Sequence, residues 1–92
     1  MTKVKLSHKA KKDLKRLPIH IIRKFDLWVD GVETKGIQSI MKVKGYHDEP
    51  LQGNRKGQRS IRLSRSYRAI YIDLGNNKYE IIEVIEVNKH DY

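Results

Sequence analysis

Apolar and polar residues alternate along the C-terminal part of the chain, a pattern typical of half-buried β-strands. Residues 58–64 ("QRSIRLS"), 67–74 ("YRAIYIDL") and 78–87 ("KYEIIEVIEV") each show this alternation. The segment "GNN" between the second and the third consists of turn-forming residues. A shorter alternation in "KVKLS", residues 3–7, predicts one more strand at the start of the chain.

Residues 7–17 ("SHKAKKDLKRL") have their apolar residues at helical spacing instead. Ala10, Leu14 and Leu17 form one narrow stripe, and Ser7 is a suitable N-cap for the free amides of the first turn. Most of the other residues are lysine or arginine. This helix is therefore expected to pack on one side and to present cations on the other.

A second helix is predicted from Pro18 to Gly36. Proline disfavours helical geometry in the residue before it and suits the first turn of a helix, and glycine is a common stop. Residues 37–43 are compatible with a short third helix, whereas the glycines and proline of residues 45–57 predict an irregular loop. The apolar positions of the second helix are Ile22, Phe25, Trp28 or Val29, and Val32.

The predicted order of elements is β-α-α-β-β-β. Helices packed on one face of a small antiparallel sheet define an α+β fold. A chain of 92 residues can bury one hydrophobic core, but two cores of half that size would each be too small. We therefore expect a single domain that spans residues 1–92.

Arginine recurs at every third position from Arg59 to Arg68, along two predicted strands. A connection made of residues 64–66 would place Arg62 directly opposite Arg68, whereas a two-residue connection would pair Leu63 with Arg68. The first register is preferred because it gathers the apolar side chains on the other face of the sheet. These side chains are Ile61, Leu63, Tyr67, Ala69 and Tyr71.

Two guanidinium groups that face one another across a sheet repel. Each could pair with an acid on the next strand, such as Glu83 or Glu86, or both could bind one phosphate, the anion that guanidinium fits best. Nearby acids are too few to pair all the local cations, which favours an anion site.

The overall charge also indicates a polyanionic partner, with nucleic acid as the leading class. Lysine and arginine total 20 against 11 acidic residues, which gives a net charge of +9. No segment approaches the roughly 20 apolar residues needed to span a bilayer, and the N-terminus lacks the apolar core of a signal peptide. We expect a cytoplasmic protein that does not bind membranes, and the absence of cysteine fits a reducing compartment.

Residues 48–72 ("DEPLQGNRKGQRSIRLSRSYRAIYI") and the ending "VNKHDY" resemble the RelE/ParE superfamily of bacterial type II toxins. The order of a basic first helix, a long second helix, a loop and three closing strands is similar too. "DEPLQG" followed by Lys-Gly resembles YafQ-type toxins, whereas Glu49 and the terminal His and Tyr resemble YoeB-type toxins. The resemblance implies a RelE-like fold and a ribosome-dependent mRNA endonuclease that an antitoxin holds inactive.

The resemblance also implies roles for five residues. Glu49 matches the proposed general base, which YafQ-type toxins replace by histidine. Arg68 matches the arginine assigned to the scissile phosphate, and Arg62 matches a strand position that is basic or histidine. His90 matches the C-terminal acid, and Tyr92 the aromatic residue that orients a base. An aspartate separates these last two residues here, whereas they are adjacent in YoeB-type toxins.

Metal-free RNA cleavage proceeds by attack of the ribose 2′-OH on its own phosphate. This step requires a base, cations near the developing charge, and an acid for the departing 5′-oxygen. Glu49, the Arg62 and Arg68 pair, and His90 are the candidates for these three roles. The chain shows no carboxylate cluster for Mg²⁺, so no metal or cofactor is expected. The cations expected to contact RNA are Lys9, Lys11, Lys12, Lys15, Arg16, Arg55, Lys56, Arg59 and Arg65.

The expected partners are the ribosome, mRNA and a cognate antitoxin with an acidic or partly disordered neutralising segment. Operator DNA is expected as a partner of the toxin–antitoxin complex only. Two alternatives remain open: a ParE-like DNA gyrase inhibitor of the same fold, and a non-catalytic RNA-binding or ribosome-binding translation blocker. The ending "KHDY" argues against the gyrase inhibitor, because such relatives generally lack a terminal His-aromatic site.

Overall fold

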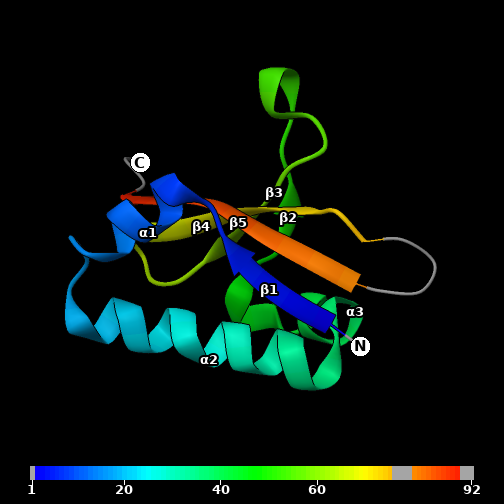
Figure 1. The fold of residues 1–92 in the computed structure, drawn as a ribbon, viewed down its shortest axis with the longest axis horizontal. Coiled ribbons are helices and arrows are strands. Elements are labelled where there is room, and N and C mark those ends of the chain that lie inside the picture. Colours follow the sequence, from blue (N-terminus) through cyan, green and yellow to red (C-terminus); the bar gives the residue numbers. More distant parts are fainter. Residues whose placement is uncertain (1, 76–79, 90–92) are drawn as a thin grey trace.

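A computed structural model describes residues 2–75 and 80–89. Five strands form one sheet in the order β1-β5-β4-β3-β2, and α2 lies along one face of it (Figure 1). The predicted α+β class is confirmed. Within the described ranges, none of the helices has the length and apolar character required to cross a bilayer. The elements are β1 (Thr2–Leu6), α1 (His8–Leu14), α2 (Ile19–Lys35), α3 (Ile37–Met41), the 3-10 turn η1 (Lys44–Tyr46), β2 (Glu49–Pro50), the 3-10 turn η2 (Gly53–Arg55), β3 (Arg59–Arg62), β4 (Tyr67–Asp73) and β5 (Glu80–Lys89).

The sheet is mixed, whereas the sequence pattern predicts an antiparallel one. β1 runs parallel to β5, with Thr2 opposite Glu80 and Leu6 opposite Val84, while the other neighbouring strands are antiparallel. An alternating pattern identifies the two faces of a strand but not its neighbour. The parallel pairing places β1 at one edge of the sheet, next to β5, although the two strands are far apart in the sequence.

The predicted helix ends are confirmed where their caps were identified. Ser7 caps α1, because its Oγ accepts a hydrogen bond from the Ala10 amide at 3.0 Å. Pro18 is the N-cap of α2, and Gly36 ends that helix at φ +85° with its amide bonded to the Val32 carbonyl. The short third helix is present as α3.

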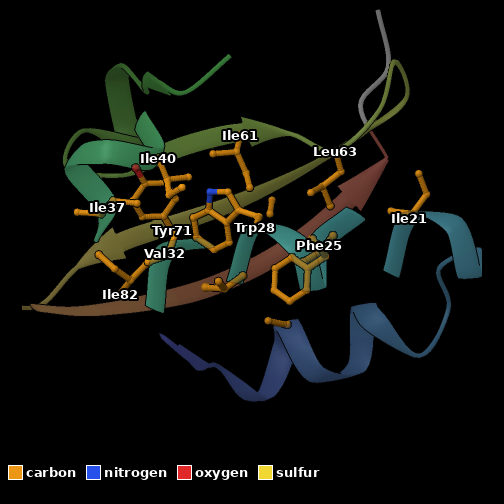
Figure 2. Close-up of a cluster of buried hydrophobic side chains, with 14 residues drawn as sticks. Ile21, Phe25, Trp28, Val32, Ile37, Ile40, Ile61, Leu63, Tyr71 and Ile82 are labelled. Atoms are coloured by element: carbon orange, nitrogen blue, oxygen red, sulfur yellow. The ribbon is translucent and has the colours of Figure 1, made fainter. Parts of the chain in front are cut away.

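The core lies between α2 and the inner face of the sheet (Figure 2). Trp28 is fully buried, and its ring centroid lies 5.4 Å from that of Tyr71 on β4 and 6.1 Å from that of Phe25. Aromatic rings of this size account for a large share of the apolar area that a small domain buries. Trp28 therefore joins α2 to the middle of the sheet.

The β3–β4 hairpin has the register that the alternation favoured. Arg62 pairs with Arg68, and the Leu63 amide donates to the Tyr67 carbonyl at 2.9 Å. The side chains of Ile61 and Leu63 are buried in the core, as expected for the opposite face. Both arginines consequently point away from the core.

One strand was not predicted. Within residues 45–57, Glu49 and Pro50 form β2 and pair with Ser60 and Arg59 at the edge of the sheet. A strand of this length shows no alternation that a sequence could reveal, and its proline tolerates only an edge position. The 3-10 turns η1 and η2 flank it, and the segment with η2 extends away from α2 (Figure 1).

Candidate nucleic-acid interface

Three of the predicted site residues lie on the outer face of the sheet, opposite the face that α2 covers. Glu49 pairs with Ser60, which lies two residues before Arg62 on the same strand, and Arg62 pairs with Arg68. Because side chains alternate along strands and match across them, Glu49, Arg62 and Arg68 share one face. Glu49 and Arg62 are exposed and Arg68 is half-buried. The structure thus brings a carboxylate and two guanidinium groups onto one surface.

Arg68 has an unusual feature for an arginine on an outer face. Its Nε is buried and has no hydrogen-bond partner among the described residues. A buried donor without a partner reduces stability, and an ionised phosphate oxygen is a strong acceptor for guanidinium. The geometry of Arg68 therefore suits a ligand that brings such an oxygen.

Arg55 provides a further guanidinium group, from the η2 turn. Its Nη2 lies 2.6 Å from Glu86 Oε1 on β5, and its Nη1 donates to Gln58 Oε1 at 3.0 Å. Asn88 Nδ2 also donates to Glu86, at 2.7 Å. Glu86 was one of two acids expected to pair with the strand arginines, and it pairs with this loop arginine instead. The contact ties the η2 segment to β5.

The ionisation of Glu86 follows from these contacts. Burial acts to raise the pKa of this carboxyl group, but the hydrogen bonds from Arg55 and Asn88 outweigh it, and the net pKa lies below the ordinary value. Glu86 is therefore a carboxylate at neutral pH, and its negative charge is compensated by Arg55.

Arg59, expected among the RNA contacts, lies on the inner face and forms an ion pair. Its Nε lies 2.7 Å from Asp48 Oδ1, and the Tyr71 hydroxyl donates to Asp48 Oδ2 at 2.5 Å. Burial acts to lower the pKa of Arg59, but the hydrogen bond and charge of Asp48 raise it overall. The pKa of Tyr71 lies far above its ordinary value, mainly because the hydroxyl is buried. The hydrogen bond to Asp48 and the negative charge of Asp48 raise it further. Sequence reasoning missed Asp48, because β2 is too short for any alternation to show which face its residues occupy.

The remaining predicted cations lie on or next to α1, beside η2 and in the turn between β3 and β4. Lys9 forms an ion pair with Asp13 at 3.0 Å within α1. The α1 helix is fixed against the end of β5, since the Val87 amide donates to Asp13 Oδ2 at 3.0 Å. This contact places α1 beside the part of β5 that pairs with Arg68. The other exposed predicted cations are Lys11, Lys12, Lys15, Arg16, Lys56 and Arg65.

His90 and Tyr92, the predicted acid and stacking residue, lie outside the described residues. The last described residue, Lys89, pairs with Tyr67, and the preceding Asn88 pairs with Arg68. The described chain therefore ends one position from the arginine pair. Near Glu49, the imidazole Nε2 of His47 lies 3.6 Å from the carboxylate, and both side chains are exposed. Across residues 2–75 and 80–89, no group of three or more His, Asp or Glu side chains is placed to hold a metal ion.

The arrangement of helices and sheet is the RelE/YoeB/YafQ-like toxin fold. A YoeB/ParE toxin from Agrobacterium tumefaciens is similar over 97% of this chain and 99% of that chain, with a TM-score of 0.74 and 20% identity. YafQ from E. coli BL21(DE3) is similar over 98% of this chain and 94% of that one, with a TM-score of 0.75 and 16% identity. The RelBE2 toxin–antitoxin complex of Mycobacterium tuberculosis contains a chain that is similar over 96% of both chains, with a TM-score of 0.69 and 20% identity. No family model matches the sequence, and no curated protein matches it either.

Proposed function

We propose that this protein is the toxin of a type II toxin–antitoxin system and that it cleaves mRNA on the ribosome. The observation that carries the proposal is the shared outer face of Glu49, Arg62 and Arg68. A carboxylate and two guanidinium groups on one face supply a base for the 2′-OH and cations for the phosphate, which are two of the three functions that cleavage requires. The similarity in fold to YoeB, YafQ and RelBE2 toxins supports the same class.

The chemistry assigns one role to each group. Glu49 would accept the proton of the 2′-OH as its oxygen attacks phosphorus. Arg62 and Arg68 would stabilise the negative charge that develops on the phosphorane oxygens. The bond to the 5′-oxygen breaks, His90 would protonate that oxygen, and the products are a 2′,3′-cyclic phosphate and a free 5′-hydroxyl. Tyr92 would stack on a base and fix the nucleotide.

The exposure of the site supports the proposed dependence on the ribosome. Glu49 lies on an edge strand with its side chain 54% exposed, so the described residues leave this carboxylate open to solvent. Positioning of reactants can account for about 7–11 kcal/mol of a barrier. A ribosome that holds mRNA in one conformation would supply this positioning, while the cations of α1 and Lys56 would contact ribosomal RNA phosphates.

The partner that neutralises the toxin would be an antitoxin with an acidic or partly disordered segment. The net charge of +9 favours such a segment, and one similar structure is a toxin–antitoxin complex. Binding to operator DNA would belong to that complex. The site of action would be the cytoplasm, where translating ribosomes are found.

The proposal is tested by incubating the purified protein with programmed ribosomes and, separately, with the naked mRNA. Primer extension should show codon-phased cuts on the ribosome-bound mRNA and much slower cleavage of the naked RNA. Glu49→Gln and Arg68→Ala should each reduce the cuts by at least about 10²-fold, to a low but measurable rate, without preventing ribosome binding. DNA damage in cells without mRNA cuts would indicate a gyrase inhibitor, and blocked translation without cuts would indicate a non-catalytic binder.

A further inference from the structure

A buried polar cluster lies directly behind Glu49, on the inner face of the sheet. Asp48 precedes Glu49 in the sequence, and its side chain is only 1% exposed. One carboxylate oxygen accepts from Arg59 at 2.7 Å and the other from the Tyr71 hydroxyl at 2.5 Å. Tyr71 is itself buried against Trp28. Asp48 is therefore connected through Tyr71 to the centre of the core.

The strand that carries Glu49 has few other contacts that could fix its position. β2 consists of two residues, and Pro50 has no amide hydrogen to donate. The Leu51 amide bonds to the Gln58 carbonyl at 2.9 Å, and beyond it lie the turns of η2. On the other side, His47 has a left-handed backbone with φ +48°. So short an edge strand cannot hold its place through backbone hydrogen bonds alone.

We infer that Asp48, held by Arg59 and Tyr71, is a positioning residue that fixes β2 in the sheet and thereby keeps Glu49 on the face of Arg62 and Arg68. Since neighbouring side chains of a strand point to opposite faces, an inward Asp48 requires an outward Glu49. The inference rests on the proposed function for its effect on cleavage, but its effect on β2 can be measured without any cleavage.

Few contacts of its own hold the Glu49 side chain in one orientation. The side chain of Glu49 is exposed, and the described structure gives it one contact, with His47 at 3.6 Å. Its placement therefore depends on the backbone of β2. A misplacement of about 1 Å at a reacting group can lower a rate by about 10²-fold. By restricting the movement of β2, Asp48 and its two partners would increase the rate of cleavage without contacting the RNA.

The test uses Tyr71→Phe, which deletes one hydrogen bond to Asp48 and keeps the ring against Trp28. Tyr46→Phe is the control, because the Tyr46 ring is partly buried against the core and its hydroxyl has no partner among the described residues. Tyr71→Phe should lower kcat on ribosome-bound mRNA by about ten-fold with KM nearly unchanged. It should also speed hydrogen exchange at the Leu51 amide while leaving the amides between β4 and β5 protected.

A double-mutant cycle separates positioning from general destabilisation. In a Glu49→Gln background, Tyr71→Phe should cause no further loss of cleavage, because it acts through Glu49. An equal loss in both backgrounds, or unchanged exchange at Leu51 in Tyr71→Phe, would overturn the inference. If the wild-type protein cleaves no RNA, the proposed function fails, and the exchange measurement alone still decides whether the cluster fixes β2.

Discussion

Arg62 and Arg68 face each other directly across the β3–β4 hairpin, and the Nε of Arg68 is buried without a partner in the described part of the chain. Like charges opposite one another and an unpaired buried donor each lower the stability of the free protein. A phosphate would compensate both features, since its oxygens accept hydrogen bonds and its charge offsets the repulsion. The features of this arginine pair that favour phosphate binding therefore lower the stability of the free protein.

Replacing Arg68 with methionine should separate these two effects. Methionine preserves much of the aliphatic packing while removing the charge and the unpaired donor. The free energy of unfolding should rise by about 1 kcal/mol, while cleavage of ribosome-bound mRNA should fall by at least about 10²-fold. Urea denaturation and primer extension measure the two quantities. Arg23→Met, an exposed arginine of α2, is the control and should change neither; an Arg68→Met variant that is less stable yet fully active would contradict this account.

The ion pair between Glu86 and Arg55 should make stability depend on pH in the acidic range. The pKa of Glu86 in the folded protein is lower than its ordinary value of 4.5, so the carboxylate stabilises the fold above that pH. The contribution is lost as the pH falls through the folded pKa. Glu86→Gln should therefore lower the free energy of unfolding at neutral pH by about 1 kcal/mol, a small figure because Arg55 is partly exposed to solvent.

The measurement is urea denaturation of both proteins from about pH 7 to about pH 3. The difference between wild type and Glu86→Gln should be constant near neutral pH and should shrink at the acidic end. Glu83→Gln is the control, because Glu83 lies on the same strand with no ion pair recorded in the described structure. A difference that grows toward low pH would show that folding does not lower the pKa of Glu86.

Much of the hairpin and of the helix ends could be predicted because each depends on neighbouring residues. Only one connection between β3 and β4 keeps Ile61 and Tyr67 on one face, so alternation was sufficient to pair Arg62 with Arg68. Ser7 was identifiable as a cap from its position before an apolar stripe. The parallel pairing of β1 with β5 depends on residues far apart in the sequence, and no local pattern encodes it.

In the candidate site, too, some positions could be predicted from neighbouring residues and others could not. The outer-face position of Arg68 followed from the register, whereas the positions of Arg59 and Arg55 did not follow from their charge. Which cation pairs with an acid depends on where β2 and η2 fold back on the sheet, and these segments are too short to have a period. Asp48 was overlooked for that reason.

Gly36→Ala should destabilise the protein by about 1–3 kcal/mol, because Gly36 has φ +85° and ψ +155°, a backbone conformation that side chains disfavour. The added methyl group itself would meet nothing closer than Glu80 Oε1 at 3.7 Å, so the cost is conformational strain rather than a clash. Gly45→Ala is the matched control, since no atom lies within 4 Å of an added Cβ there and its φ is not positive. The measurement is the thermal unfolding midpoint, which should be lower in Gly36→Ala than in Gly45→Ala. Equal midpoints would contradict the assignment of strain to Gly36.

The basic face of α1 should determine ribosome affinity through its location and not through net charge alone. Lys11, Lys12 and Lys15 are exposed, whereas Lys9 of the same helix is paired with Asp13. If these three lysines contact phosphates, replacing them with alanine should lower affinity and should reduce the slope of log K against log salt concentration by about 2–3. Binding to ribosomes at several salt concentrations gives both quantities.

The control is a variant with the same loss of charge elsewhere, Lys24→Ala, Lys35→Ala and Lys42→Ala, on α2 and at the end of α3. These lysines are exposed too, but they do not lie on the helix that is fixed against β5 beside Arg68. Long-range attraction depends on total charge and would affect both variants alike, whereas direct contacts release counterions only where phosphates are bound. A salt slope reduced equally in both variants would therefore mean that the protein is attracted to the ribosome without α1 forming part of the contact.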